Sequence, residues 1–186
     1  MTTMAAGPWG PASGGYAAAV DSVCQLLEAD VTAEKVAWEF ARSTLECWGV
    51  AGLGPQLYAA VGELVANALD HGMSPVLEPP FPCPLVLNLQ REGPDLLCAV
   101  FDPGVAVPRK DAGMGLRIVE AVSNRWGWTE PGPNGKAVWA AFAAPGSTAA
   151  PARATVDRLL TLVGAFTGSE RPHLIPAGPA PLLAGS

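Results

Sequence analysis

Two residues one helical turn apart carry chemistry that a cofactor site can use. Glu63 and Asn67 stand four positions apart in an apolar-patterned segment, so both project from the same face of a helix. Magnesium prefers oxygen ligands and takes only one or two from protein when phosphates supply others, a demand that the carboxamide oxygen of Asn67 meets. Glu63 can then orient or deprotonate an attacking hydroxyl. Taken by itself, the spacing is more typical of two solvated positions on an amphipathic helix.

A second segment supplies residues suited to a nucleotide. Asp102 ends a strand-like run, and Gly104 follows it closely. Gly113 and Gly115 open a further helix, where backbone N–H groups bind phosphate well. Taken alone, Asp102 is an ordinary strand-end turn residue, and the two glycines are a weak signal. Together with the first segment, they provide what a magnesium–nucleotide site requires.

Neighbouring residues extend this candidate site. Met114 and Leu116 flank the second glycine and are counted with the nucleotide-binding positions, although the apolar spacing of Leu116 favours a place in the core. Lys110 lies in the loop before the helix, where its ammonium group can either reach the β- or γ-phosphate or stay in solvent. Lys136 begins the last strand-like run and is less favoured as a phosphate ligand.

The elements that must position these residues follow from periodicity and turn signals. Apolar residues at i, i+3, i+4 and i+7 predict a helix from about Pro55 to His71, which carries Glu63 and Asn67. Thr32 is placed to cap an earlier helix, from Ala33 to about Trp48. The other predicted elements are strands over Leu85–Arg91, Asp95–Phe101, Trp126–Glu130 and Lys136–Phe142, and a helix from about Gly115 to Asn124.

Composition limits the class of protein. The chain has 186 residues and a formal net charge of −6, which argues against nonspecific binding to nucleic acid. No run reaches the apolar length needed to cross a membrane, and the N-terminus lacks the features of a signal peptide. The four cysteines have no metal-ligand spacing, so we expect buried free thiols in a reducing cytoplasm. No Walker A motif, Ser/His/Asp set or His/Cys cluster can be assembled.

The chain divides into three parts by composition. Residues 1–19 are rich in Gly, Pro and Ala and are expected to be disordered. Residues 20–144 hold the well-patterned elements and are expected to form one domain. Residues 145–186 return to Ala, Gly and Pro, with one short helix predicted over Val156–Phe166.

These motifs, in this order, resemble the Bergerat ATP-binding fold of the GHKL superfamily, and in particular the histidine-kinase-like ATPase domain of actinobacterial anti-sigma-factor serine/threonine kinases. The likeness runs from about Cys24 to Ala144 and includes Arg125-Trp126-Gly127 and Lys136-Ala137-Val138-Trp139. It implies an opening strand over Ser22–Glu28, a segment whose own apolar spacing fits a helix. The implied fold for residues 20–144 is an α/β two-layer sandwich, with helices packed on one face of a mixed, mostly antiparallel sheet.

The resemblance also implies roles for individual residues, with ATP or ADP and Mg²⁺ as ligands. Glu63 corresponds to the base, Asn67 to the magnesium ligand, and Asp102 to the carboxylate that accepts a hydrogen bond from the adenine amino group. Gly104 lets the backbone approach the adenine ring closely. Two features depart from the family: the lid after Gly104 has only eight residues before the glycine segment, and Ala106 stands where a second glycine is expected.

Two functions remain open from the sequence. The first is a cytoplasmic serine/threonine protein kinase that phosphorylates a small anti-anti-sigma (STAS-like) partner and so regulates a sigma factor. The second is a noncatalytic nucleotide-binding protein that regulates transcription by gripping such a partner. Glu63 favours the enzyme, and the short lid favours the binder. Neither function involves direct contact with nucleic acid or a membrane, and a homodimer is compatible with both.

Overall fold

The computed structural model describes residues 20–72, 85–93, 95–108, 113–132 and 135–143, together with residues 156, 157 and 161. In chain order the elements are β1 (Val20–Leu27), α1 (Ala33–Trp48), the 3₁₀ turn η1 (Ala51–Leu53), α2 (Gly54–His71), β2 (Leu85–Glu92), β3 (Asp95–Asp102), α3 (Gly113–Val122), β4 (Arg125–Trp128) and β5 (Lys136–Phe142). No helix in these described ranges is long and apolar enough to span a membrane. The expected disordered segment 1–19 and most of the tail 145–186 lie outside the described residues.

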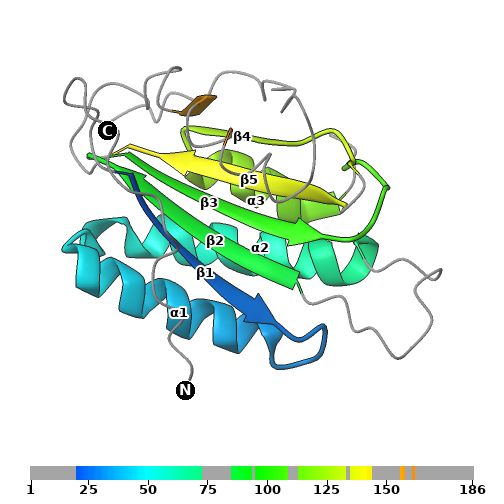
Figure 1. The fold of residues 1–186 in the computed structure, drawn as a ribbon, viewed down its shortest axis with the longest axis horizontal. Coiled ribbons are helices and arrows are strands. Elements are labelled where there is room, and N and C mark those ends of the chain that lie inside the picture. Colours follow the sequence, from blue (N-terminus) through cyan, green and yellow to red (C-terminus); the bar gives the residue numbers. More distant parts are fainter. Residues whose placement is uncertain are drawn as a thin grey trace, which may run out of the picture.

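The five strands form one antiparallel sheet in the order β1-β2-β3-β5-β4 (Figure 1). Each neighbouring pair is antiparallel, so the expectation of a mixed sheet is wrong for the strands described. β3 and β4 run in the same direction, but β5 lies between them and pairs antiparallel with both. The connection through α3 therefore links two strands of like direction without creating a parallel pair.

Three helices cover one face of this sheet (Figure 1). Buried side chains from all three join strand residues in one core cluster, which includes Leu45 of α1, Leu64 of α2, Val119 of α3 and Leu87 of β2. α2 lies between α1 and α3 and contacts both of them as well as β3. This arrangement is consistent with the expected two-layer sandwich, and it places α2 across the middle of the sheet.

The predicted elements agree with the structure where the sequence pattern is strongest. α2 buries its apolar stripe, made of Leu57, Ala60, Val61, Leu64, Val65 and Ala68. β5 has the predicted bounds, and the opening strand that the resemblance implied is present as β1. α3 begins at Gly113 rather than Gly115, and β4 ends at Trp128 rather than Glu130.

Thr32 does not cap α1 with its side chain, contrary to expectation. Its Oγ1 donates instead to Oδ1 of Asp30 at 2.6 Å, and its backbone N–H donates to the same atom at 2.7 Å. The carboxylate of Asp30 therefore draws the hydroxyl of Thr32 away from the first turn of the helix.

The second face of the sheet is also buried along its centre. Its apolar cluster contains Leu97, Ala99 and Phe101 of β3 and Ala137, Trp139 and Ala141 of β5. Val156, in the C-terminal part of the chain, belongs to the same cluster and is 0% exposed. The C-terminal region thus contributes at least one side chain to the packing of residues 85–143.

Two of the three described cysteines are exposed, which corrects the expectation of buried thiols. All three are free, but only Cys98, in the middle of β3, is buried. Cys24 lies on the edge strand β1, opposite Asn88, and Cys47 lies on the exposed side of α1. Apolar neighbours in sequence do not bury a residue on an edge strand or on the outer face of a helix. Cys83 lies outside the described residues.

Candidate functional site

Two segments that are distant in sequence approach α2 at separate points: the end of β3 lies against the end of the helix, and the start of α3 lies beside Glu63 in its middle. A Cβ atom added to Gly72, which follows α2, would lie 2.4 Å from Cγ of Asp102 at the end of β3. A Cβ on Gly104 would lie 2.6 Å from the carbonyl oxygen of Gly72. A Cβ on Gly115 of α3 would lie 2.6 Å from Oε2 of Glu63. Glycine at these positions allows α2, β3 and α3 to approach each other this closely.

α2 presents Glu63 and Asn67 at the edge of its buried stripe. Both residues are half-buried, whereas Leu64 and Ala68 beside them are buried in the core. Oε2 of Glu63 faces Gly115 in the first turn of α3. Among the described residues, neither the carboxylate nor the carboxamide makes a hydrogen bond or an ion pair. Both groups are therefore available to a ligand between α2 and α3.

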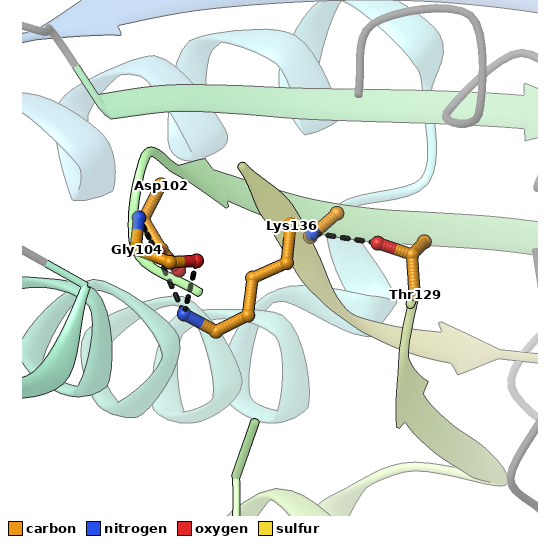
Figure 2. Close-up of polar contacts among 5 residues, drawn as sticks. Asp102, Gly104, Thr129 and Lys136 are labelled. Carbon is orange, nitrogen blue, oxygen red and sulfur yellow. Dashed lines mark hydrogen bonds and ion pairs between the residues drawn. The ribbon is translucent and has the colours of Figure 1, made fainter. Parts of the chain in front are cut away.

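A buried ion pair joins the end of β3 to the start of β5 (Figure 2). Asp102 and Lys136 are direct partners across the two strands. Nζ of Lys136 donates to Oδ1 of Asp102 at 2.6 Å and to the carbonyl oxygen of Gly104 at 3.3 Å. The backbone N–H of Gly104 donates to the same Oδ1 at 2.9 Å. The side chain of Lys136 is 1% exposed and that of Asp102 is 0% exposed, so the pair is enclosed by protein.

One oxygen of this pair lacks a partner. Oδ2 of Asp102 is buried and accepts no hydrogen bond within the part of the chain that the structure describes. Burial raises the pKa of Asp102 above its ordinary value, and the opposing effects of Lys136 and of the Gly104 N–H are smaller. Leaving a buried acceptor unsatisfied costs about 1–3 kcal/mol. Oδ2 is therefore the atom of this site that gains most from a donor on a ligand.

The contacts of Thr129 and the backbone conformation of Gly135 hold Lys136 opposite Asp102. Oγ1 of the buried Thr129 accepts a hydrogen bond from the N–H of Ala137 at 2.9 Å (Figure 2), and the N–H of Thr129 donates to the carbonyl oxygen of Ala137 at 2.9 Å. Gly135 has a φ of +102°, and a Cβ there would lie 2.0 Å from the carbonyl oxygen of Asp102. Only glycine fits this position, which brings the turn before β5 against the end of β3.

α3 begins in the glycine segment, as the phosphate-binding hypothesis requires. Gly113 is its first residue, and the N–H groups of the first turn of a helix have no partner within the helix. Met114, the second residue of the helix, is 72% exposed. Leu116 is buried and packs in the main core with Val119, which assigns it to the packing of α3. Lys110 lies outside the described residues.

Sequence reasoning did not find that Lys136 pairs with Asp102. The pairing depends on the register of β3 and β5, which are not consecutive strands. One signal was available in the sequence: β5 contains a single charged residue, Lys136, at the head of an apolar run. A lone charge in a buried strand requires an opposite charge nearby, and β3 ends in one.

A pocket of about 420 Å³ lies elsewhere, and none of the candidate residues lines it. It is formed by Trp38, Glu39 and Arg42 of α1 and by Tyr58 and Ala59 of α2. Its surface is almost wholly apolar, and Nε1 of Trp38 is already bonded to the carbonyl oxygen of Tyr58 at 3.1 Å. Because specific ligand sites combine an apolar lining with several converging polar groups, we place the candidate site at Asp102 and not in this pocket.

Comparison with known proteins adds no assignment. No protein-family model matches this chain, and no curated protein matches it. A functional conclusion for this chain therefore depends on the residues and contacts described above.

Proposed function

We propose that this protein binds ATP or ADP with Mg²⁺ and acts as a serine/threonine protein kinase on a small regulatory protein in the cytoplasm. One observation carries the proposal: Asp102, whose Oδ2 is unpartnered among the described residues, lies against the end of α2, and the first turn of α3 lies beside Glu63 on the polar edge of the same helix. Each offers a group that a different part of a magnesium nucleotide needs.

The base and the phosphates would take opposite ends of this arrangement. Asp102 supplies the acceptor for an exocyclic amino group, and Gly104 keeps the backbone beside it free of side-chain atoms. The N–H groups at the start of α3, from Gly113 onward, suit phosphate oxygens. The resemblance in sequence implies that the eight residues between Gly104 and Gly113 serve as a short lid between these two ends.

Magnesium fits the proposal as an ion held mainly by the nucleotide. The described residues contain no group of three or more His, Cys, Asp or Glu side chains that could hold a metal ion. Magnesium in nucleotide sites commonly takes one or two protein oxygens, the remaining ligands being phosphates and waters. The carboxamide oxygen of Asn67, half-buried and without a partner among the described residues, is suited to be such a ligand.

Glu63 is the residue that favours transfer over binding alone. Its carboxylate lies against the first turn of α3, beside the place proposed for the phosphates. Catalysis of phosphoryl transfer depends on positioning the acceptor hydroxyl and neutralising charge, and a carboxylate in this place can align or deprotonate that hydroxyl. A small anti-anti-sigma protein of the STAS type is the proposed acceptor, on the strength of the resemblance in sequence.

A second function is favoured by one feature. The segment between Gly104 and Gly113 has eight residues, which is short for a lid that must cover a γ-phosphate. This feature favours a noncatalytic protein that binds nucleotide and its partner protein without transferring phosphate.

One experiment separates the two functions. The full chain is incubated with γ-³²P-labelled ATP, Mg²⁺ and a panel of small STAS-type proteins, and incorporation of label is compared between wild type and Glu63→Gln. Glu46→Gln, at an exposed position of α1 whose side chain pairs with Arg42, serves as the matched control. If the protein is a kinase, wild type and Glu46→Gln transfer label to a partner protein, and Glu63→Gln transfers much less. Nucleotide binding without label in any partner would leave only the binder.

A further inference from the structure

Among the described residues, the contacts of the Asp102–Lys136 pair leave one acceptor and one donor unused. An ammonium group has three N–H donors, and two of those on Lys136 are directed at Asp102 Oδ1 and the Gly104 carbonyl oxygen. On the carboxylate, Oδ2 is buried and unpartnered within the described residues. An unused donor therefore stands beside an unused acceptor in an enclosed position.

The complement of such a pair is a flat edge that carries a donor next to an acceptor. Adenine has this pattern on two edges, since its exocyclic amino group donates and both N1 and N7 beside it accept. The N1 edge lies farther from the ribose, so it is the edge that reaches an enclosed pair first. The edge of guanine also has an acceptor and a donor side by side, but it carries a further amino group that would remain unmatched. Because an unmatched donor in a buried site costs affinity, adenine satisfies the pair more fully than guanine.

We infer that Lys136 is a specificity-determining residue that donates to N1 of adenine, while Oδ2 of Asp102 accepts from the amino group. This inference rests on the proposed function, because it concerns how the proposed nucleotide is read. Lys136 thus acts on the base and not on phosphate. Its bond to Oδ1 and the Thr129–Ala137 contacts hold the ammonium group in place before the nucleotide arrives. Since both side chains are buried, the base can reach them only if the protein around the pair moves.

The first test compares ADP with two analogues on the full wild-type chain by calorimetry in Mg²⁺. In 1-deaza-ADP a C–H replaces N1, and in 7-deaza-ADP a C–H replaces N7, on the other side of the ring. Hydrogen bonds that involve a charged group typically change affinity by about ten-fold or more. We expect 1-deaza-ADP to bind at least about ten-fold more weakly than ADP, and 7-deaza-ADP to bind like ADP. Equal binding of ADP and 1-deaza-ADP would overturn the inference and leave the proposed function intact.

A variant identifies the donor. In Lys136→Met the affinity for ADP should fall, and the ratio of the affinities for ADP and for 1-deaza-ADP should approach one. Lys35→Met, at an exposed position of α1, should keep the wild-type ratio. A folded Lys136→Met that still discriminates as wild type does would show that another donor reads N1. If no nucleotide binds to wild type, the proposed function fails, and the inference fails with it.

Removal of Lys136 leaves the buried carboxylate of Asp102 without its counterion, so a measurement on the unaltered side chain is needed as well. The chain has three lysines, Lys35, Lys110 and Lys136, so ε-¹⁵N-lysine labelling gives three side-chain signals at most. Lys35→Arg and Lys110→Arg assign them by loss of signal. We expect the Lys136 signal to shift on addition of ADP and to shift much less on addition of 1-deaza-ADP at saturation. Identical shifts with both ligands would contradict a bond from Lys136 to N1.

Discussion

Gly72 and Asp102 are packed so closely that a Cβ atom on Gly72 would lie 2.4 Å from the carboxyl carbon of Asp102. The same Cβ would lie 2.6 Å from the carbonyl oxygen of Ala68, which belongs to the last turn of α2. The absence of a side chain at Gly72 therefore allows the end of α2 to lie against the buried carboxylate. This contact fixes the position of α2, which carries Asn67, relative to the end of β3, which carries Asp102.

Gly72→Ala should destabilise the protein and disturb Asp102. Neither the backbone of α2 nor a buried ion pair can move aside cheaply, and overpacking of this kind typically costs about 1–3 kcal/mol. Urea unfolding measures the loss. Gly62→Ala in the same helix is the control, because the nearest atoms to its Cβ would be those of the Trp38 side chain, at 3.3 Å, and Ala favours a helix over Gly by about 1 kcal/mol. Equal stability of the two variants would contradict the close contact at Gly72.

Glu63→Gln should leave nucleotide binding nearly unchanged while phosphoryl transfer collapses. The substitution keeps the size of a half-buried side chain and removes only its charge and basicity. A positioned base typically contributes about 10²–10⁴ in rate, so a loss of that order is expected in single-turnover transfer. Transfer that survives the substitution undiminished would show that another group aligns the acceptor hydroxyl.

Asn67→Ala should abolish the dependence of nucleotide affinity on magnesium. Asn67 lies at the edge of the buried stripe of α2, so the loss of its side chain should affect folding little. The measurement is the ratio of ADP affinities in Mg²⁺ and in EDTA, with Gln56→Ala at an exposed position of the same helix as the control. A variant that keeps the full wild-type ratio would rule out Asn67 as a magnesium ligand.

Val156→Asp should destabilise the domain, because Val156 is 0% exposed among apolar side chains of β3 and β5. An unpaired charge in such a place is among the most destabilising single substitutions, and a loss of about 3 kcal/mol or more is expected. Val31→Asp makes the same change at a residue that is 99% exposed and should alter stability by less than about 0.5 kcal/mol. Similar unfolding midpoints for the two variants would show that the C-terminal region does not pack on the sheet in solution.

Elements with a strong local pattern could be predicted from the sequence. The apolar stripe of α2 runs from Leu57 to Ala68 and Gly72 follows the helix, so the bounds of α2 differ from expectation by one residue at the start. β1 could not be assigned from its own residues, because Val20, Val23 and Leu27 fit helical spacing. Its place at the edge of the sheet is set by pairing with β2, a long-range contact.

The same distinction applies to the candidate site. Glu63 and Asn67 could be paired in advance, because four residues in a helix bring side chains to one face whatever the rest of the chain does. The partnership of Asp102 with Lys136 could not, because it depends on which strands become neighbours and in what register. The buried state of that ion pair also depends on a long-range contact, the close approach of Gly72 at the end of α2 to Asp102.

Titration calorimetry of the full wild-type chain with ADP in the presence of Mg²⁺ tests the central proposal most directly, because it requires neither a partner protein nor turnover. We expect saturable binding of one nucleotide per chain, accompanied by an upward shift of the thermal unfolding midpoint, and weaker binding when EDTA replaces Mg²⁺. The absence of both heat and thermal shift at millimolar ADP and at millimolar ATP would contradict the proposal that Asp102, Asn67 and the start of α3 form a nucleotide site.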